Sequence, residues 1–262
     1  MPNNYVKIVI TNNIIELMEY EKLNVKGKPN TKALEIEKGL GEFKEENYTN
    51  YQKVRRDTIR RLVTMNFDKS KSKFVTLTFR ENIKDVKVAN SLFKAFIRRL
   101  KKVYKELLYV SVIEFQDKNN RGAVHYHMIC NLPYIKSKDL EQIWGNGFIK
   151  INSIMKVDNI GAYVIKYMTK EKADARLQGL KAYNCSKGLL RPYEVSSWSN
   201  GDEITKMIFD KYNLNEKRPV YFAEYTSEQA GHIIYKQFNF NRIEEFNQND
   251  TKSGYSSTKS SV

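Results

Sequence analysis

Cysteine, histidine and long apolar runs are all scarce in this chain. The two cysteines, Cys130 and Cys185, lie in dissimilar contexts and form no CxxC pair, which excludes a disulfide framework. No apolar run approaches the roughly 20 residues that a membrane-spanning helix needs, and the first residues lack the pattern of a signal peptide. We therefore expect a protein of a reducing cytoplasm, without a membrane partner.

Positive charge, by contrast, is abundant. Lysine and arginine number 45 against 30 aspartates and glutamates, which gives a net charge of +15, while 41% hydrophobic residues are enough for a packed core. A chain this basic usually binds a polyanion, although a basic surface without such a partner has the same composition.

Hydrophobic periodicity predicts an α+β fold. Strands joined in sequence by a tight loop favour an antiparallel sheet with helices packed on one face. We expect strands over residues 5–10, 14–20, 74–79, 109–116, 123–132 and 148–154, and an aromatic hairpin over 219–240. We expect helices over 48–67, 86–107, 138–144, 159–170 and 202–212. The predicted parts are an N-terminal hairpin and connector (1–46), a core with a leading basic helix (47–175), a C-terminal extension (176–246) and a disordered tail (247–262).

Two of the three histidines, His125 and His127, are separated by a single residue. Alternate residues of a strand point to the same side, so both imidazoles are expected on one face. Tyr126 then points to the opposite face, under helices. Such a pair can hold a divalent ion, or it can be two hydrogen-bonded histidines without a metal.

A carboxylate lies beside these imidazoles if the hairpin adopts one register. When Gln116 pairs with Ala123, Glu114 lies directly opposite His125 on the same face. A slip of one residue turns Glu114 away and makes it an ordinary exposed carboxylate. Two histidines and a glutamate with open positions suit Mg²⁺ or Mn²⁺ acting on a phosphate. Gln116 and Asp117 are the alternative third ligands.

Two tyrosines one helical turn apart form a second candidate site. At about 100° per residue, two tyrosines and two lysines share one side of the expected helix: Tyr163, Lys166, Tyr167 and Lys170. The aliphatic residues of the other side are expected to pack against the protein: Ala162, Val164, Ile165 and Met168. A nearby ammonium group favours a phenolate and steadies a phosphate. In an ordinary helix the same tyrosines would be amphipathic residues at the rim.

The helix expected over 48–67 is rich in arginine. It presents either a solvated face or a surface that contacts phosphates. The candidate phosphate-binding residues are Arg55, Arg56, Arg60 and Arg61, together with Lys170 of the tyrosine helix.

Three of these segments, in this order, resemble the three motifs of the HUH endonucleases, and the likeness covers residues 74–170. They are the strand over 74–79, the run from Arg121 to His127, and the helix from Tyr163 to Lys170. The chain is most similar to the two-tyrosine rolling-circle replication initiators (Rep) of Gram-positive plasmids and phages. Its tyrosine helix also resembles the gene A proteins of small icosahedral phages.

The resemblance implies a ferredoxin- or RRM-like HUH core in which His125, His127 and Glu114 hold Mg²⁺ or Mn²⁺. Tyr163 and Tyr167 would then be the catalytic pair. One forms a 5′-phosphotyrosine with single-stranded origin DNA and frees a 3′-OH primer, and the other allows the strands to be rejoined, while Lys166 assists at the phosphate.

The resemblance also implies partners in a bacterial host. Single-stranded origin DNA is the expected substrate, and duplex origin DNA would meet either the basic residues 53–73 or the C-terminal third of the chain. Since the sequence contains no GxxxxGK[ST] loop, unwinding is expected from a host helicase and synthesis from a host polymerase.

Three alternatives stay open. In mobilisation relaxases the tyrosine often precedes the histidine pair, whereas here it follows. One-tyrosine transposases lack the second tyrosine. A non-catalytic basic nucleic-acid-binding protein would explain the charge but not the coincidence of the two motifs.

Overall fold

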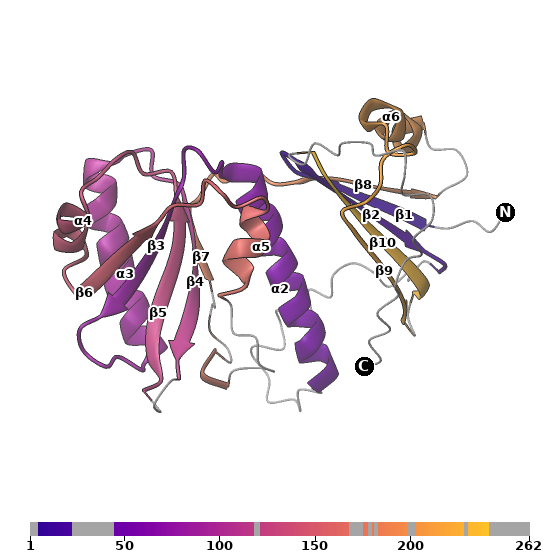
Figure 1. Cartoon of the computed structure of the whole chain (residues 1–262). Helices are drawn as coiled ribbons and strands as arrows, with labels where there is room; N and C mark the ends of the chain where they lie inside the picture. The colour runs from indigo at the N-terminus through magenta and orange to yellow at the C-terminus, as the bar shows by residue number, and fades with distance from the viewer. Residues whose placement is uncertain are drawn as a thin grey trace.

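The computed structural model describes residues 5–22, 45–117, 121–167, 175–177, 180, 183–198, 203–227 and 230–240, with the backbone alone for 45–52. Most of the predicted connector and the whole predicted tail lie outside these residues. The described strands form two antiparallel five-stranded sheets, with helix α2 (Glu45–Asn66) between them (Figure 1). No described helix is both long enough and apolar enough to cross a membrane.

The first sheet, called the site sheet below, has the order β6-β3-β5-β4-β7 and contains both candidate histidines. Its strands are β3 (Lys73–Phe79), β4 (Tyr109–Gln116), β5 (Ala123–Cys130), β6 (Gly147–Asn152) and β7 (Tyr183–Cys185). All four pairings are antiparallel. The predicted α+β class and antiparallel sheet are therefore confirmed.

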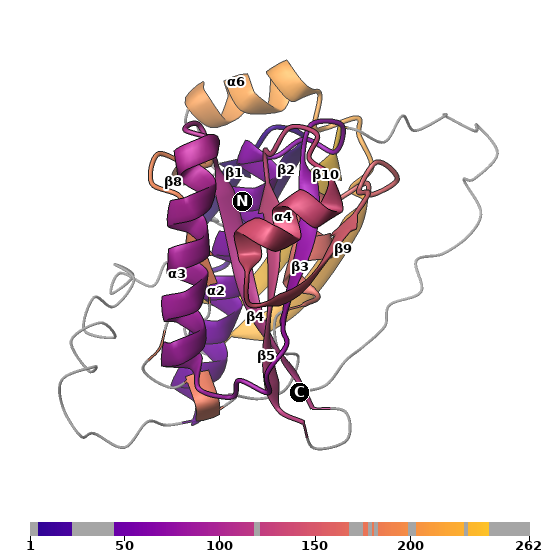
Figure 2. The same cartoon turned by 90° about the vertical axis from the view of Figure 1, so that its left-hand side faces the viewer.

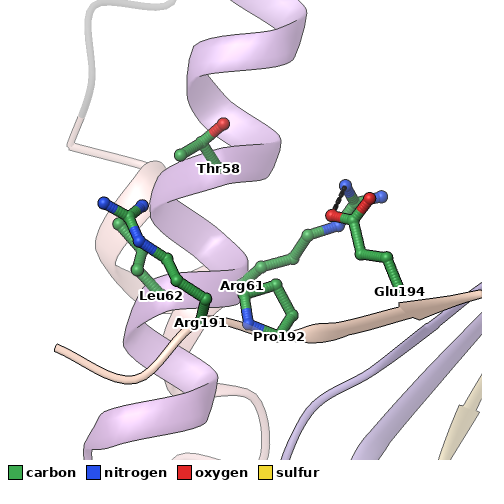
Figure 3. Close-up of a pocket in the computed structure, with 6 residues that line it drawn as sticks. All are labelled: Thr58, Arg61, Leu62, Arg191, Pro192 and Glu194. Carbon is green, nitrogen blue, oxygen red and sulfur yellow. Dashed lines mark ion pairs between the residues drawn. The ribbon is translucent and has the colours of Figure 1, made fainter.

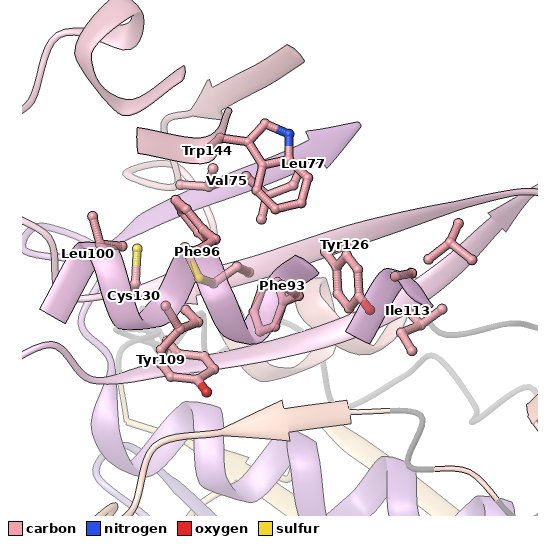
Figure 4. Packing of buried hydrophobic residues seen from close by; sticks show 14 of the residues in the cluster. Val75, Leu77, Phe93, Phe96, Leu100, Tyr109, Ile113, Tyr126, Cys130 and Trp144 are labelled. Atoms are coloured by element: carbon pink, nitrogen blue, oxygen red, sulfur yellow. The ribbon is translucent and has the colours of Figure 1, made fainter. Parts of the chain in front are cut away.

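Helices α3 (Val86–Val103) and α4 (Ser137–Trp144) cover one face of the site sheet. Tyr126 is fully buried there, as expected from strand alternation, with its ring 4.4 Å from that of Phe93 (Figure 4). Phe96 packs against Trp144 and so joins the two helices. The side chain of Asp85 caps the start of α3, and Gly145, at φ 68°, ends α4 where the sequence predicts.

The opposite face of the site sheet is covered as well, by α2 and α5 (Ile160–Ile165). Ile59 and Leu62 of α2 pack with Phe74 of β3 and Val164 of α5 in one buried cluster. The helix predicted over 159–170 ends at Ile165, and the next two residues form a turn. This face of the sheet carries the histidines, so α5 lies directly beside them.

The second sheet, called the terminal sheet below, joins strands from both ends of the chain. Its order is β8-β1-β2-β10-β9, from β1 (Tyr5–Ile10), β2 (Ile14–Tyr20), β8 (Tyr193–Trp198), β9 (Tyr221–Ser227) and β10 (Gly231–Asn239). Helix α6 (Glu203–Tyr212) covers its outer face through Ile208. Figure 2 views the molecule from the side of α3 and α4, with the terminal sheet behind the site sheet. The two predicted hairpins are thus confirmed, and segments expected to be separate share one sheet.

Candidate functional site

The β4–β5 hairpin has the register that brings a carboxylate to the histidines. Gln116 pairs with Ala123, and Glu114 pairs with His125. On the other side of β5, strand β3 pairs Thr76 with His127. Cross-strand partners project to the same face, so the two histidines, Glu114 and Thr76 share one surface of the sheet.

His127 is buried and contacts polar groups at both ring nitrogens. Nε2 lies 2.5 Å from Oε2 of Glu114, and Nδ1 lies 3.2 Å from Oγ1 of Thr76. With its proton on Nε2 the ring donates to Glu114, and with its proton on Nδ1 it donates to Thr76. In the second tautomer, Nε2 and the carboxylate are two acceptors that face each other, an arrangement that a cation stabilises.

His125, the second histidine of the pair, has a ring nitrogen without a hydrogen-bond partner among the described residues. This atom, Nε2, is buried. Burial lowers the pKa of His125, repulsion from His127 and Arg121 lowers it further, and Glu114 opposes these effects. The imidazole is therefore neutral at neutral pH, which is the form that binds metals.

The donor set fits a divalent cation in type but is not gathered into a closed cluster. No three His, Cys, Asp or Glu side chains are grouped as a metal site within the described part of the chain. A cation bound by His127 and Glu114 would replace the proton between Nε2 and Oε2. The partnerless Nε2 of His125 and the acidic partner of His127 are the observations that favour such a site.

The two alternative ligands differ in what they already bind. Gln116 lies two residues from Glu114 in β4 and therefore on the same face, and its Oε1 atom is buried without a partner among the described residues. Both carboxylate oxygens of Asp117 accept hydrogen bonds from Arg176, at 2.8 and 2.9 Å. Gln116 therefore stays a candidate third ligand, whereas Asp117 already pairs with Arg176.

The two tyrosines lean onto the histidine surface. Oη of Tyr167 donates a hydrogen bond of 3.1 Å to Oη of Tyr163. The Tyr167 ring stacks on the imidazole of His127 with centroids 4.2 Å apart, and both tyrosine rings lie 5.0 Å from Phe74. Burial, the hydrogen bond to Tyr163 and the negative charges of Tyr163 and Glu114 raise the pKa of Tyr167.

Lys166 lies over the tyrosine pair, as the sequence predicts. Its Nζ atom is 3.8 Å from the centroid of the Tyr163 ring and 5.0 Å from that of Tyr167. Lys170 and Met168 lie outside the described residues. Val164 is buried as expected, but Ala162 is exposed. The expectation that Ala162 packs against the protein is wrong, because α5 is rotated so that Gly161 and the tyrosines face inward.

Three residues that shape the site do not stand out in the sequence. Phe74 supports both tyrosine rings, and Thr76 contacts His127. Gly161 lies so close to α2 that a side chain there would overlap the carbonyl oxygen of Arg60. The alternation of β3 could have placed Phe74 and Thr76 on one face, but nothing local indicates which helix packs on that face.

The predicted phosphate contacts of α2 are mostly used inside the protein. Arg60 and Arg61 both pair with the buried carboxylate of Glu16 in β2, at 2.9 and 2.7 Å. Arg55 is buried as well, and Arg56 is half-buried. The guanidinium groups of Arg60 and Arg61 therefore join α2 to the terminal sheet, and phosphate binding by these arginines stays a prediction.

A pocket of about 390 Å³ lies between α2 and β8 (Figure 3). Arg61 reaches across it toward Glu194, with Nη1 and Oε1 3.9 Å apart, and Arg191 lines the same space. No residue of the histidine and tyrosine site lines this pocket. It therefore reflects the junction of α2 with β8, separate from the candidate site.

Residues 72–172 match the sequence profile of a family described as replication-associated protein ORF2/G2P. The matched segment contains β3 to α5, and so all of the histidine and tyrosine site. Searches of curated proteins and of solved structures returned no match. The match supports a Rep-type replication initiator, in the context of plasmid or phage DNA replication.

Proposed function

We propose that the chain nicks single-stranded DNA at a replication origin by tyrosine transesterification and then rejoins strands. The observation that carries this proposal is the stacking of Tyr167 on His127, with the Tyr163 hydroxyl and Lys166 beside it. This part of the chain brings together two tyrosine hydroxyl groups, the ammonium group of Lys166 and a sheet face with side chains of the kind that bind metals. All of them lie within the segment similar to replication-associated proteins. A non-catalytic binding protein has no need of this arrangement.

Tyr163 is the better first nucleophile in this proposal. It accepts the hydrogen bond from Tyr167, and its ring lies nearest to the Lys166 ammonium group. Burial and the hydrogen bond that Tyr167 donates to Tyr163 raise the pKa of Tyr167, which disfavours its ionisation to the nucleophilic phenolate. Attack forms a bond between Tyr163 Oη and phosphorus and breaks the bond from phosphorus to the 3′ oxygen, which leaves protonated as a 3′-OH.

The other residues of the site would position the scissile phosphate and balance its negative charge. In this proposal His125, His127 and Glu114 bind Mg²⁺ or Mn²⁺, with Gln116 as the alternative third side chain. When bound, such a cation supplies Lewis-acid polarisation of a phosphate oxygen. Thr76 orients the His127 ring from the far nitrogen, and Lys166 adds positive charge near the phosphate.

End-labelled DNA tests the chemistry directly. Single-stranded DNA from the replicon that encodes the chain is incubated with the protein and Mn²⁺. A 3′ label should appear on a protein-linked band, because the phosphotyrosine retains the 3′ segment. A 5′ label should appear on a shorter free strand that a polymerase can extend. DNA that is bound but unchanged would contradict the proposal and favour a binding protein.

Single tyrosine variants separate the two roles. We expect Tyr163→Phe to abolish the first protein-linked product, whereas Tyr167→Phe retains it and loses rejoining. Tyr134→Phe is the matched control, because Tyr134 is an exposed tyrosine outside the site and should change neither step. Retention of first cleavage in Tyr163→Phe and its loss in Tyr167→Phe would reverse the assignment.

A further inference from the structure

One row of mostly aromatic residues crosses every strand of the terminal sheet. Tyr5 pairs with Trp198 on one side and with Tyr20 on the other. Tyr20 pairs with Ile233, which pairs with Tyr225. Residues directly opposite one another project to the same face, so these five form a continuous line from β8 to β9. We call this line the aromatic row.

The aromatic row lies on the face that looks toward α2. Tyr20 and Glu16 are four residues apart in β2 and share this face, where Glu16 pairs with Arg60 of α2. The other face packs under α6 through residues such as Ile8. Lys53, in the N-terminal half of α2, reaches over the row and places Nζ 4.8 Å from the centroid of the Tyr225 ring.

The two rings at the ends of the row are exposed, whereas Ile233, between Tyr20 and Tyr225, is buried. Trp198 is 47% exposed, Tyr225 is also exposed, and Tyr5 and Tyr20 are half-buried. The Tyr5 ring lies 5.7 Å from the Trp198 ring and 6.2 Å from the Tyr20 ring. Neighbouring strands are about 4.8 Å apart, so five strands present a line about 19 Å long. That length suits an extended chain of several flat groups.

Charge around the row favours an anionic partner. Three acidic groups whose side chains the structure describes on this face and on the facing helix are ion-paired: Glu16 with Arg60 and Arg61, Asp57 with Arg60, and Glu194 with Lys7. Lys53 adds a cation at one end, and the whole chain carries a net charge of +15. Aromatic platforms beside cations bind single-stranded nucleic acid, because each base has a face that stacks on a ring.

We infer that the aromatic row binds single-stranded DNA, with bases stacked on Trp198, Tyr5, Tyr20 and Tyr225 and the backbone near Lys53. The row lies outside the segment that matches replication-associated proteins. It adds a second DNA contact to the proposed nicking function, on the opposite side of α2 from the tyrosines. Binding at the row requires neither a metal nor cleavage, so it is measured independently of that function.

Tryptophan fluorescence reports on this surface. The chain has two tryptophans, and Trp144 is 0% exposed whereas Trp198 is 47% exposed. The full chain is titrated with an oligothymidylate of about 15 nucleotides in the absence of divalent metal. Stacking should quench Trp198, and the emission left in Trp198→Phe should not respond to DNA. Absence of quenching in the unaltered chain overturns the inference.

Affinity measured by fluorescence anisotropy gives the second test. Trp198→Ala and Tyr225→Ala should each weaken binding roughly five- to a hundredfold. Tyr193→Ala and Phe222→Ala are matched controls, because they alter exposed aromatics of the same two strands on the opposite face. Equal losses in all four variants would overturn the inference.

A duplex of the same length completes the comparison. Its bases are already stacked and paired, so it should quench Trp198 far less than the single strand; equal quenching overturns the inference. If the protein-linked DNA band never forms but these binding results hold, the nicking proposal fails alone. If the band forms but Trp198→Ala binds normally, the inference about the aromatic row fails alone.

Discussion

Replacing Glu16 by glutamine would break the connection between α2 and the terminal sheet. The Glu16 side chain is 1% exposed and pairs with Arg60 and Arg61, which are 11% and 15% exposed. Glutamine keeps the size but removes the buried counter-charge that Arg60 and Arg61 share, which leaves Arg60 with the partly exposed Asp57 and Arg61 with Glu194 at 3.9 Å. Removal of one partner from a buried ion pair costs about 3–5 kcal/mol, so we expect a loss of that order in the free energy of unfolding.

Glu19→Gln is the matched control on the same strand. Glu19 pairs with Lys236 at 2.9 Å, but the two side chains are 25% and 32% exposed. Solvent screens this pair, and its loss should cost at most about 1 kcal/mol. Urea denaturation at neutral pH, followed by circular dichroism, measures both variants. Similar losses in the two would refute the view that Glu16 is a buried counter-ion.

The dependence on pH provides a further check of the same pair. Burial alone would raise the pKa of Glu16, but the hydrogen bond from Arg61 and the charges of both arginines outweigh it. The pKa therefore lies below its ordinary value of 4.5. A carboxyl group whose pKa is lowered in the folded protein stabilises the fold at pH values above its pKa in the unfolded chain. This stabilisation is lost as the pH falls. The difference in the free energy of unfolding between the unaltered chain and Glu16→Gln should thus become smaller below about pH 4.5. A difference that stays constant with pH would contradict this reasoning.

Three other substitutions or reactions are informative. Gly161→Ala should lower the free energy of unfolding by about 1–3 kcal/mol, because α5 touches α2 at this residue. Thermal melts measure the effect, and an unchanged or higher melting temperature would contradict it. Thr76→Val should weaken Mn²⁺ binding about 10–100-fold in calorimetry, since it removes the partner of His127 Nδ1, and unchanged affinity would argue against that role. Burial raises the pKa of the Cys130 thiol to about 12. A thiol reagent should therefore label only the half-buried Cys185 in the folded protein and both cysteines in urea. Rapid labelling of both cysteines in the folded protein would show that Cys130 is accessible.

The sequence predicts most of the site sheet because its signals are local. Strand alternation places His125 and His127 on one face, and the short hairpin limits the possible registers to a few. The pairing of Glu114 with His125 shows which of the registers left open by the sequence the hairpin adopts, and it is the one that brings Glu114 to the histidine face. The roles of the histidines, of Tyr163 and of Tyr167 stay predictions, because chemistry depends on a substrate and a metal that geometry alone does not supply.

Contacts between distant parts of the chain could not be predicted from the sequence. Helical periodicity shows that Arg60 and Arg61 share a helix with other arginines, but Glu16 lies more than forty residues earlier and meets them only after folding. The same periodicity continues the tyrosine helix to residue 170, whereas the described helix ends at Ile165. Such contacts depend on which elements pack together, and periodicity does not carry that information.

The sequence by itself determined most of the helices and strands and the shared face of the two histidines, since these follow from local spacing, but it did not indicate strands β7 and β8 and it left the hairpin register open. Only the tertiary structure decided that β2 pairs with β10 and that the tyrosines rest on His127. It also aligned Trp198, Tyr5, Tyr20 and Tyr225 in one row, although these residues are scattered over both ends of the chain. Pairing between distant strands is selected by the whole core, so residues far apart in sequence become one surface only in the folded chain.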